Sequence, residues 1–230
     1  MNADELKTWR KELRAELIAR RLAANPSELL AWNEAIRHHI DRAFPNLARG
    51  VVAFCWPHKS EFDARFLMRD LRERGAVTAL PVVVAPKTPL IFREWHPGVK
   101  LAKGTLDIPY PVHSPEVVPD SVLLPMNGFD EAGYRLGYGG GYFDRTLAGL
   151  NKKPLVIGVT YELARLATIF PQTYDLPMDF IVTERGVYER SSGKIELLAR
   201  RGQKPEPGPY SSPACYAHEI APDYFNGEKD

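Results

Sequence analysis

Short, continuous apolar runs recur along the chain, and each suits a strand that is buried on both faces of a sheet. They cover residues 50–56, 76–84, 122–125, 154–160 and 180–184. A more mixed run at residues 90–95 is expected to be antiparallel or to lie at an edge. Helical patterns separate several of these runs. The alternation of strand, loop and helix predicts an α/β protein with a mainly parallel sheet between helical layers.

The chain opens with a predicted helix over residues 4–23, in which apolar side chains recur at helical spacing. These are Leu6, Trp9, Leu13, Leu17 and Leu22. The other face of this helix is basic and interleaved with acidic residues, which by itself is typical of a solvated surface. Arg10 and Arg14 are four positions apart and therefore lie on one side of the helix.

Two further helices are predicted in the first third of the chain. Asn25 as N-cap, Pro26 at the first helical position and Glu28 form a capping box that starts one of them. The other covers roughly residues 61–74, which places Glu61 and Asp63 in its first turn. There they are ordinary helix-start acids, but they also follow the end of a strand, where open α/β sheets bind ligands.

Composition excludes several classes of function. The 230 residues are 44% hydrophobic. They include 30 basic and 29 acidic side chains, and the resulting net charge of +1 does not indicate binding to nucleic acid or to an anionic membrane. No apolar run approaches a membrane span, and the N-terminus is not a signal peptide. Cys55 and Cys215 have no metal-type spacing. We predict a cytoplasmic protein with one domain over residues 1–199 and a Pro- and Gly-rich extension over 200–230.

A glycine-rich stretch at residues 127–145 stands between an apolar run and a helical pattern at residues 142–150. Its glycines are Gly133, Gly137, Gly139, Gly140 and Gly141. Such a loop can bring backbone N–H groups close to an anion, and Arg135 adds a cation that suits phosphate. The glycines fit neither the P-loop nor the dinucleotide fingerprint, and alone they fit a structural turn equally well. Asp144, in the first helical turn, could hold Mg²⁺ beside phosphates or simply favour the helix start.

The run from Gly133 to Arg145 resembles the signature of the 5-formyltetrahydrofolate cyclo-ligase family, the 5,10-methenyltetrahydrofolate synthetases. The resemblance extends from about residue 6 to about residue 190. It implies a three-layer α/β/α fold with a mainly parallel central sheet. It also implies the ATP- and Mg²⁺-dependent cyclisation of 5-formyltetrahydrofolate to 5,10-methenyltetrahydrofolate, with release of ADP and phosphate. A monomer that binds ATP, Mg²⁺ and a reduced folate is therefore expected.

The resemblance also implies roles for individual residues. Catalysis falls to Arg135 and Tyr142, and metal binding to Asp144 and Asp179, the acid before the last predicted strand. Folate is expected at Trp56 and Glu61. Nucleotide binding is expected from the basic pair of the first helix and from the central loop: Arg10, Arg14, Arg135, Leu136, Gly137, Tyr138, Gly139, Gly140, Gly141, Tyr142 and Phe143. Arg10 stands where the family has lysine, and the two cations are not equivalent at a phosphate.

One stretch departs from the family pattern. The family commonly has a Gly-Ile-x-Glu-Pro-like sequence where this chain has Thr105-Leu106-Asp107-Ile108-Pro109, without the glutamate. Two alternatives therefore stay open at this stage. One is an enzyme of the same fold that uses ATP to activate another formyl or amide substrate. The other is a nucleotide- or folate-binding protein without turnover.

Overall fold

The computed structural model describes residues 1–198, and their largest element is an eight-stranded sheet. The predicted extension 200–230 and Cys215 lie outside the described residues. The order of strands across the sheet is β13-β12-β11-β9-β6-β1-β2-β3. Their bounds are β1 Val51–Phe54, β2 Val77–Val82, β3 Ile91–Trp95, β6 Ser121–Pro125, β9 Leu155–Val159, β11 Phe180–Thr183, β12 Gly186–Ser191 and β13 Lys194–Leu197.

The centre of the sheet is parallel and its edges are antiparallel. Strands β2, β1, β6, β9 and β11 pair in parallel, whereas β3 pairs antiparallel with β2. At the other edge, β12 and β13 form an antiparallel hairpin beside β11. The runs predicted as buried strands thus form the centre, and residues 90–95 form the expected antiparallel edge. The mainly parallel sheet of the predicted fold class is confirmed.

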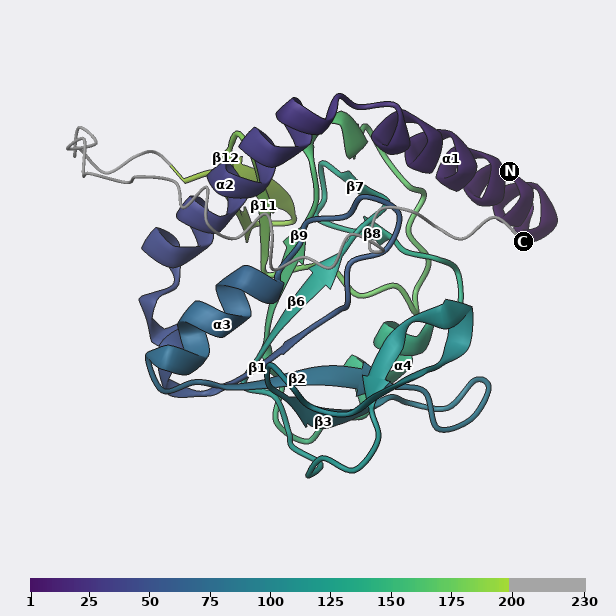
Figure 1. The fold of residues 1–230 in the computed structure, drawn as a ribbon. Helices are drawn as coiled ribbons and strands as arrows, with labels where there is room; N and C mark the ends of the chain where they lie inside the picture. The colour runs from purple at the N-terminus through teal and green to yellow at the C-terminus, as the bar shows by residue number, and fades with distance from the viewer. Residues whose placement is uncertain (199–230) are drawn as a thin grey trace, which may run out of the picture. The chain divides into compact units, whose positions relative to one another are not determined.

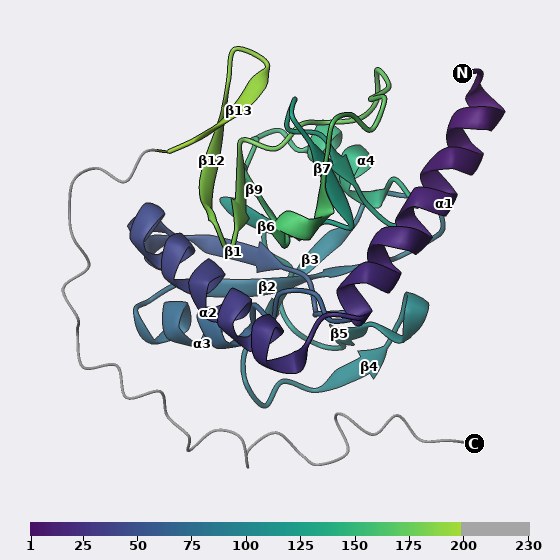
Figure 2. The same ribbon diagram turned by 90° about the horizontal axis from the view of Figure 1, so that it is seen from above.

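Helices cover both faces of this sheet (Figures 1 and 2). On one face lie α2 (Pro26–Ala43) and α3 (Arg65–Glu73), whose buried side chains share a core with β1, β2, β9 and β11. On the other face, α4 (Tyr142–Gly149) contributes Leu147 to a second core. That core also includes Phe129, from a small sheet formed by β7 (Gly128–Asp130), β8 (Arg135–Leu136) and β10 (Arg165–Leu166). One core lies on each face of the large sheet, so the sheet forms the middle of three layers.

Helix α1 (Ala3–Leu22) lies beside the small sheet rather than over the large one (Figure 2). Its Leu17 shares a core with Leu136 and Ile169. Within residues 1–198, no helix is both long and apolar enough to cross a membrane.

One local prediction needs correction, and two hairpins before α4 were not predicted. Helix α3 begins at Arg65 rather than near residue 61, so Glu61 and Asp63 belong to the preceding loop. The glycine-rich stretch does not run straight from β6 into α4, because the β7–β8 hairpin stands between them. The hairpin of β4 (Leu101–Lys103) and β5 (Pro109–Pro111) was not predicted. The capping box that starts α2 at Asn25 is present as predicted.

Candidate active site

A cavity of about 1340 Å³ opens at the carboxyl ends of the parallel strands, where open α/β sheets bind ligands. Five parts of the chain line it: one face of α1, the loop after β1, the end of β2, the β4–β5 hairpin and residues 135–145. Residues 172–176 complete the wall. Every sequence-predicted site residue except Asp179 lines this cavity.

The glycine-rich loop brings bare backbone against cationic side chains. Gly139 and Gly141 have φ of 89° and 63°, a region that favours glycine. A Cβ on Gly139 would lie 3.1 Å from the Arg14 guanidinium, which is a tight contact, so a larger residue would also displace Arg14. Arg14 donates from Nε to the carbonyl of Gly137 over 2.6 Å, and the loop ends at the start of α4. Both the loop and the start of the helix line the cavity.

Arg135 and Asp144 form an ion pair at the wall of this cavity. The Arg135 guanidinium is 2.7 Å from Asp144 Oδ1 and also donates to the Leu176 carbonyl over 3.1 Å. The same Asp144 oxygen accepts the Leu176 amide over 3.3 Å. Arg135 has a side chain only 7% exposed, so its direction is fixed by these bonds. An oriented guanidinium is a means of stabilising charge that develops on a phosphoryl group.

Arg10 also turns toward the cavity, where it is held by residues 169–175. Its guanidinium donates to the carbonyls of Ile169 and Phe170 and lies 2.7 Å from Asp175 Oδ2. Burial and the neighbouring Arg10 lower the pKa of Arg14. The interpretation of this helix face as merely solvated is wrong for both arginines, because their partners come from the last third of the chain and from the central loop.

Glu61 belongs to the loop that follows β1 and is buried, with 7% of its surface exposed. The Tyr138 hydroxyl donates to Glu61 Oε1 over 2.7 Å, and the His58 amide donates to Oε2 over 3.1 Å. Arg21 of α1 lies 3.7 Å from Oε1. Each carboxylate oxygen has a lone pair left, so Glu61 can still accept N–H groups from a ligand.

Trp56 presents an aromatic wall that is supported from behind. The Arg65 guanidinium lies 4.9 Å from the centre of its ring, a cation–π distance. Asp63 fixes Arg65 through two bonds of 2.8 and 2.6 Å. Asp63, predicted as a helix-start acid, thus acts as a support for the arginine beneath Trp56.

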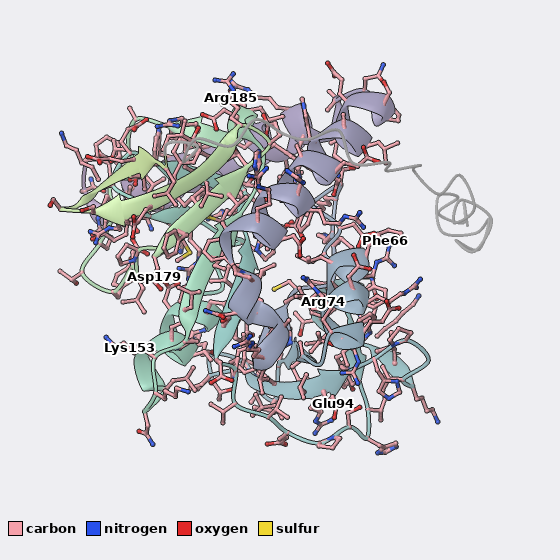
Figure 3. The ribbon with its side chains drawn as sticks, turned by 90° about the vertical axis from the view of Figure 1, so that its left-hand side faces the viewer. Phe66, Arg74, Glu94, Lys153, Asp179 and Arg185 are labelled. Carbon is pink, nitrogen blue, oxygen red and sulfur yellow. The ribbon has the colours of Figure 1, made fainter. Side chains whose placement is uncertain are left out.

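Asp179 is not brought to the other site residues, and the predicted pairing with Asp144 is wrong. It precedes β11, at the amino ends of the parallel strands, while the cavity lies at their carboxyl ends (Figure 3, where Asp179 and Arg185 mark the two ends of β11). Its carboxylate accepts the Val156 amide at the start of β9 over 2.8 Å. No group of three or more His, Cys, Asp or Glu suited to a metal occurs in the part of the chain that the structure describes.

Several residues at the site were not singled out from the sequence. Arg21 belongs to the basic residues of this helix that were interpreted as solvated, although its spacing from Leu17 and Arg14 places it on their side of the helix and away from its exposed neighbour Arg20. Asp175 and Leu176 lie in a loop without periodicity. The acidic character of residues 175–179 was visible in the sequence, but it drew attention to Asp179 rather than to Asp175.

The burial of Glu61 predicts how stability depends on pH. Burial is the largest influence and raises the pKa of Glu61, against the hydrogen bond from Tyr138 and the Arg21 cation. A carboxyl that holds its proton more tightly when folded loses stability as pH rises above its unfolded pKa of about 4.3. We therefore expect the difference between the unfolding free energies of the wild type and of Glu61→Gln to fall as pH rises above about 4.3, until Glu61 is fully ionised in the folded protein. Urea unfolding of both proteins measures this difference, and a constant or rising difference would contradict the prediction.

Comparison with known proteins gives one consistent result. The family model described as 5-formyltetrahydrofolate cyclo-ligase family matches residues 6–184. A protein of Escherichia coli K12 named 5-formyltetrahydrofolate cyclo-ligase is 28% identical over 177 residues, which are 74% of this chain and 97% of the relative.

Solved structures agree with the family match. The NMR structure of 5,10-methenyltetrahydrofolate synthetase from Aquifex aeolicus has a TM-score of 0.69 at 26% identity and covers 84% of this chain and 99% of its own. A 5,10-methenyltetrahydrofolate synthetase from Mycoplasma pneumoniae shares the fold, with a TM-score of 0.62 at 21% identity over 76% of this chain and 98% of its own. The chain belongs to the 5-formyltetrahydrofolate cyclo-ligase family and is a ligase.

Proposed function

We propose that this protein uses ATP to cyclise 5-formyltetrahydrofolate to 5,10-methenyltetrahydrofolate, with release of ADP and phosphate. One observation carries the proposal beyond the family match. A single cavity joins a glycine-rich loop with three arginines, Arg10, Arg14 and Arg135, to a buried carboxylate and an aromatic wall. The first set suits a nucleoside triphosphate and the second suits a flat heterocycle with N–H donors.

The reaction needs positioning and charge neutralisation more than a side-chain nucleophile. The formyl oxygen attacks the γ-phosphorus and ADP departs, which turns a poor leaving group into a phosphate ester. N10 of the folate then attacks the activated carbon and closes the ring, its proton is released, and the C–O bond breaks as inorganic phosphate leaves. We assign to Arg135 the stabilisation of charge on the transferring phosphoryl group, and to Tyr142, which lines the same cavity at the start of α4, a supporting catalytic role.

Binding roles divide along the cavity. We assign the triphosphate to Arg10, Arg14 and the amides of the loop from Leu136 to Gly141, with Tyr138, Tyr142 and Phe143 beside them. We assign the pterin to Glu61 and Trp56. Glu61 accepts N–H groups of the ring, while Trp56, held by Arg65, provides an apolar face.

Asp144 is the residue proposed to hold Mg²⁺. Its carboxylate lines the cavity next to the glycine-rich loop, and one of its oxygens is oriented by Arg135. A single carboxylate fits this ion, because Mg²⁺ commonly takes one or two carboxylates together with substrate phosphates. When bound, the ion neutralises charge on the phosphates. Monomeric state and cytoplasmic location remain predictions.

The test of the reaction is the absorbance of purified protein with 5-formyltetrahydrofolate, ATP and Mg²⁺, observed at the methenyl band. We expect the band to grow only when ATP is present, with ADP and phosphate released in equal amounts. The omission of ATP and the omission of folate are the two controls. A protein that binds ATP but forms no methenyl product would overturn the proposed reaction.

A different formyl or amide substrate is the second candidate, and one observation favours it. The stretch that lacks the family glutamate, residues 105–109, connects the β4–β5 hairpin and contributes to the cavity wall. The wall is therefore altered where substrate is expected. Phosphate release from ATP with a panel of other N-formyl compounds distinguishes the candidates, because an enzyme of this second kind would prefer a panel member to 5-formyltetrahydrofolate.

A further inference from the structure

Arg21, in the last turn of α1, is buried where three parts of the chain meet. Only 3% of its surface is exposed, whereas the preceding residue, Arg20, projects outward and pairs with Glu16 on the helix surface. Burying a guanidinium is costly unless its N–H groups and its charge are satisfied. The environment of Arg21 therefore needs to supply several acceptors.

Each acceptor comes from a different part of the site. Arg21 Nε donates to the carbonyl of Lys59, in the loop after β1, over 2.8 Å. Its Nη2 lies 3.2 Å from Asn127 Oδ1, just before β7, and 3.4 Å from the Tyr138 hydroxyl oxygen in the glycine-rich loop. One side chain thus links the loop assigned to folate with the loop assigned to the nucleotide.

Tyr138 and Glu61 close this link from the other side. The Tyr138 hydroxyl accepts from Arg21 and donates its own proton to Glu61 Oε1 over 2.7 Å. Arg21 lies 3.7 Å from that same oxygen, so the three groups form a buried triangle of cation, phenol and carboxylate. Burial and Glu61 raise the pKa of Tyr138, which keeps its proton available for this bond. Such a network acts as a unit, because removing one member leaves the others unsatisfied in a low dielectric.

We propose that Arg21 is a positioning residue, which holds Glu61 as an acceptor for the folate ring and fixes the folate loop against the glycine-rich loop. The inference rests on the proposed function, since it assigns the folate ring to Glu61. Arg21 itself does not line the cavity, whereas its neighbours Glu61 and Tyr138 do. Its effect is therefore on geometry and on the charge of Glu61.

The test compares Arg21→Met and Arg21→Lys with Arg20→Met, a matched control from the same helical turn. Steady-state rates are measured with folate and ATP varied separately in the full chain. We expect Arg21→Met to raise KM for folate at least tenfold, a loss of the size that a small misplacement of a binding group causes. Arg20→Met is expected to resemble the wild type. Arg21→Lys is expected to recover part of the loss, because it restores the charge but not the fork of donors.

The pH profile separates positioning from a general loss of structure. The charged and titratable groups that face Glu61 are Arg21, Lys59, His58, Tyr138, Cys55 and Tyr161. Without the Arg21 cation, the pKa of Glu61 rises, so kcat/KM for folate should decline on the acid side at a higher pH than in the wild type. In the Glu61→Gln background, adding Arg21→Met should not shift the acid side of the pH profile. The acid decline in the wild type would then be assigned to the titration of Glu61 rather than to that of His58.

A second variant keeps the inference testable if Arg21→Met folds poorly. Tyr138→Phe removes only the shared hydroxyl, and in combination with Arg21→Lys it completes a double-mutant cycle on KM for folate. We expect the increase in KM for folate in the double variant to be clearly smaller than the product of the increases in the two single variants. Two results with an active wild type would overturn the positioning role alone. One is that Tyr138→Phe and Arg21→Lys change KM for folate independently. The other is that the Arg21 variants leave KM for folate and the pH profile unchanged. A wild type without turnover would overturn the proposed function and this inference together.

Discussion

Replacing Arg135 by methionine is expected to lower kcat by about 10³-fold, the scale typical of arginines that stabilise a phosphoryl group during its transfer. Methionine keeps much of the side-chain volume but removes the charge and the bonds to Asp144 and Leu176. Because the lost interaction is strongest in the transition state, kcat and kcat/KM should fall together. The methenyl assay at saturating ATP and folate measures kcat, and a titration of folate measures kcat/KM.

Arg185→Met is the control for this experiment, because Arg185 is exposed and does not line the cavity. Thermal unfolding of both variants shows whether the fold is retained. Arg135→Lys is expected to lie between the wild type and Arg135→Met, since a lysine keeps the charge without the planar fork. If Arg135→Met raised KM for ATP but left kcat unchanged, the residue would serve ground-state binding instead.

Asp144→Asn should lose at least about 10²-fold in turnover at moderate Mg²⁺, while Asp179→Asn should stay near the wild type. The first substitution removes the negative charge proposed to meet the metal and leaves Arg135 without its ion-pair partner. The second changes an exposed carboxylate at the opposite end of the sheet, and its amide oxygen can still accept the Val156 N–H. Rates are measured as Mg²⁺ is titrated at fixed ATP.

The two aspartates are a matched pair for this purpose. High Mg²⁺ is expected to restore part of the activity of Asp144→Asn, because the substrate phosphates still supply ligands. Equal losses in the two variants would contradict the geometry of the site, since they would require Asp179 to reach the cavity. A loss in Asp144→Asn that no Mg²⁺ concentration relieves would assign Asp144 to orienting Arg135 only.

Much of the fold could be predicted because local patterns and tertiary structure agree. The strands β1, β2, β6, β9 and β11 are mainly apolar, as expected for strands covered on both faces. The capping box at Asn25 defined the start of α2 without reference to the rest of the chain. The β12–β13 hairpin was missed because it is half exposed, so its polar outer residues break the apolar run.

The site was predictable where the chemistry is continuous in sequence and not where it depends on distant contacts. The loop from Arg135 to Asp144 carries its glycines, cation and acid within one short stretch. The position of Asp179 depends instead on which end of the sheet it occupies, which only the topology decides. Helical spacing from Leu17 puts Arg21 on the inner side of its helix, but its partners at residues 59, 127 and 138 are distant in sequence and could not be predicted from it.

The partners of α1 also have a consequence for synthesis of the protein. Arg21, Arg14 and Arg10 bind segments that are translated progressively later, near residues 127, 137 and 169–175. At about 5–20 residues per second, the ribosome needs on the order of ten seconds or more to make them after α1 has emerged. During that time Leu17 has no core, because Leu136 and Ile169 do not yet exist. The first helix to be translated is thus among the last to reach its native contacts, and a nascent chain lacks a complete binding cavity until translation is well advanced.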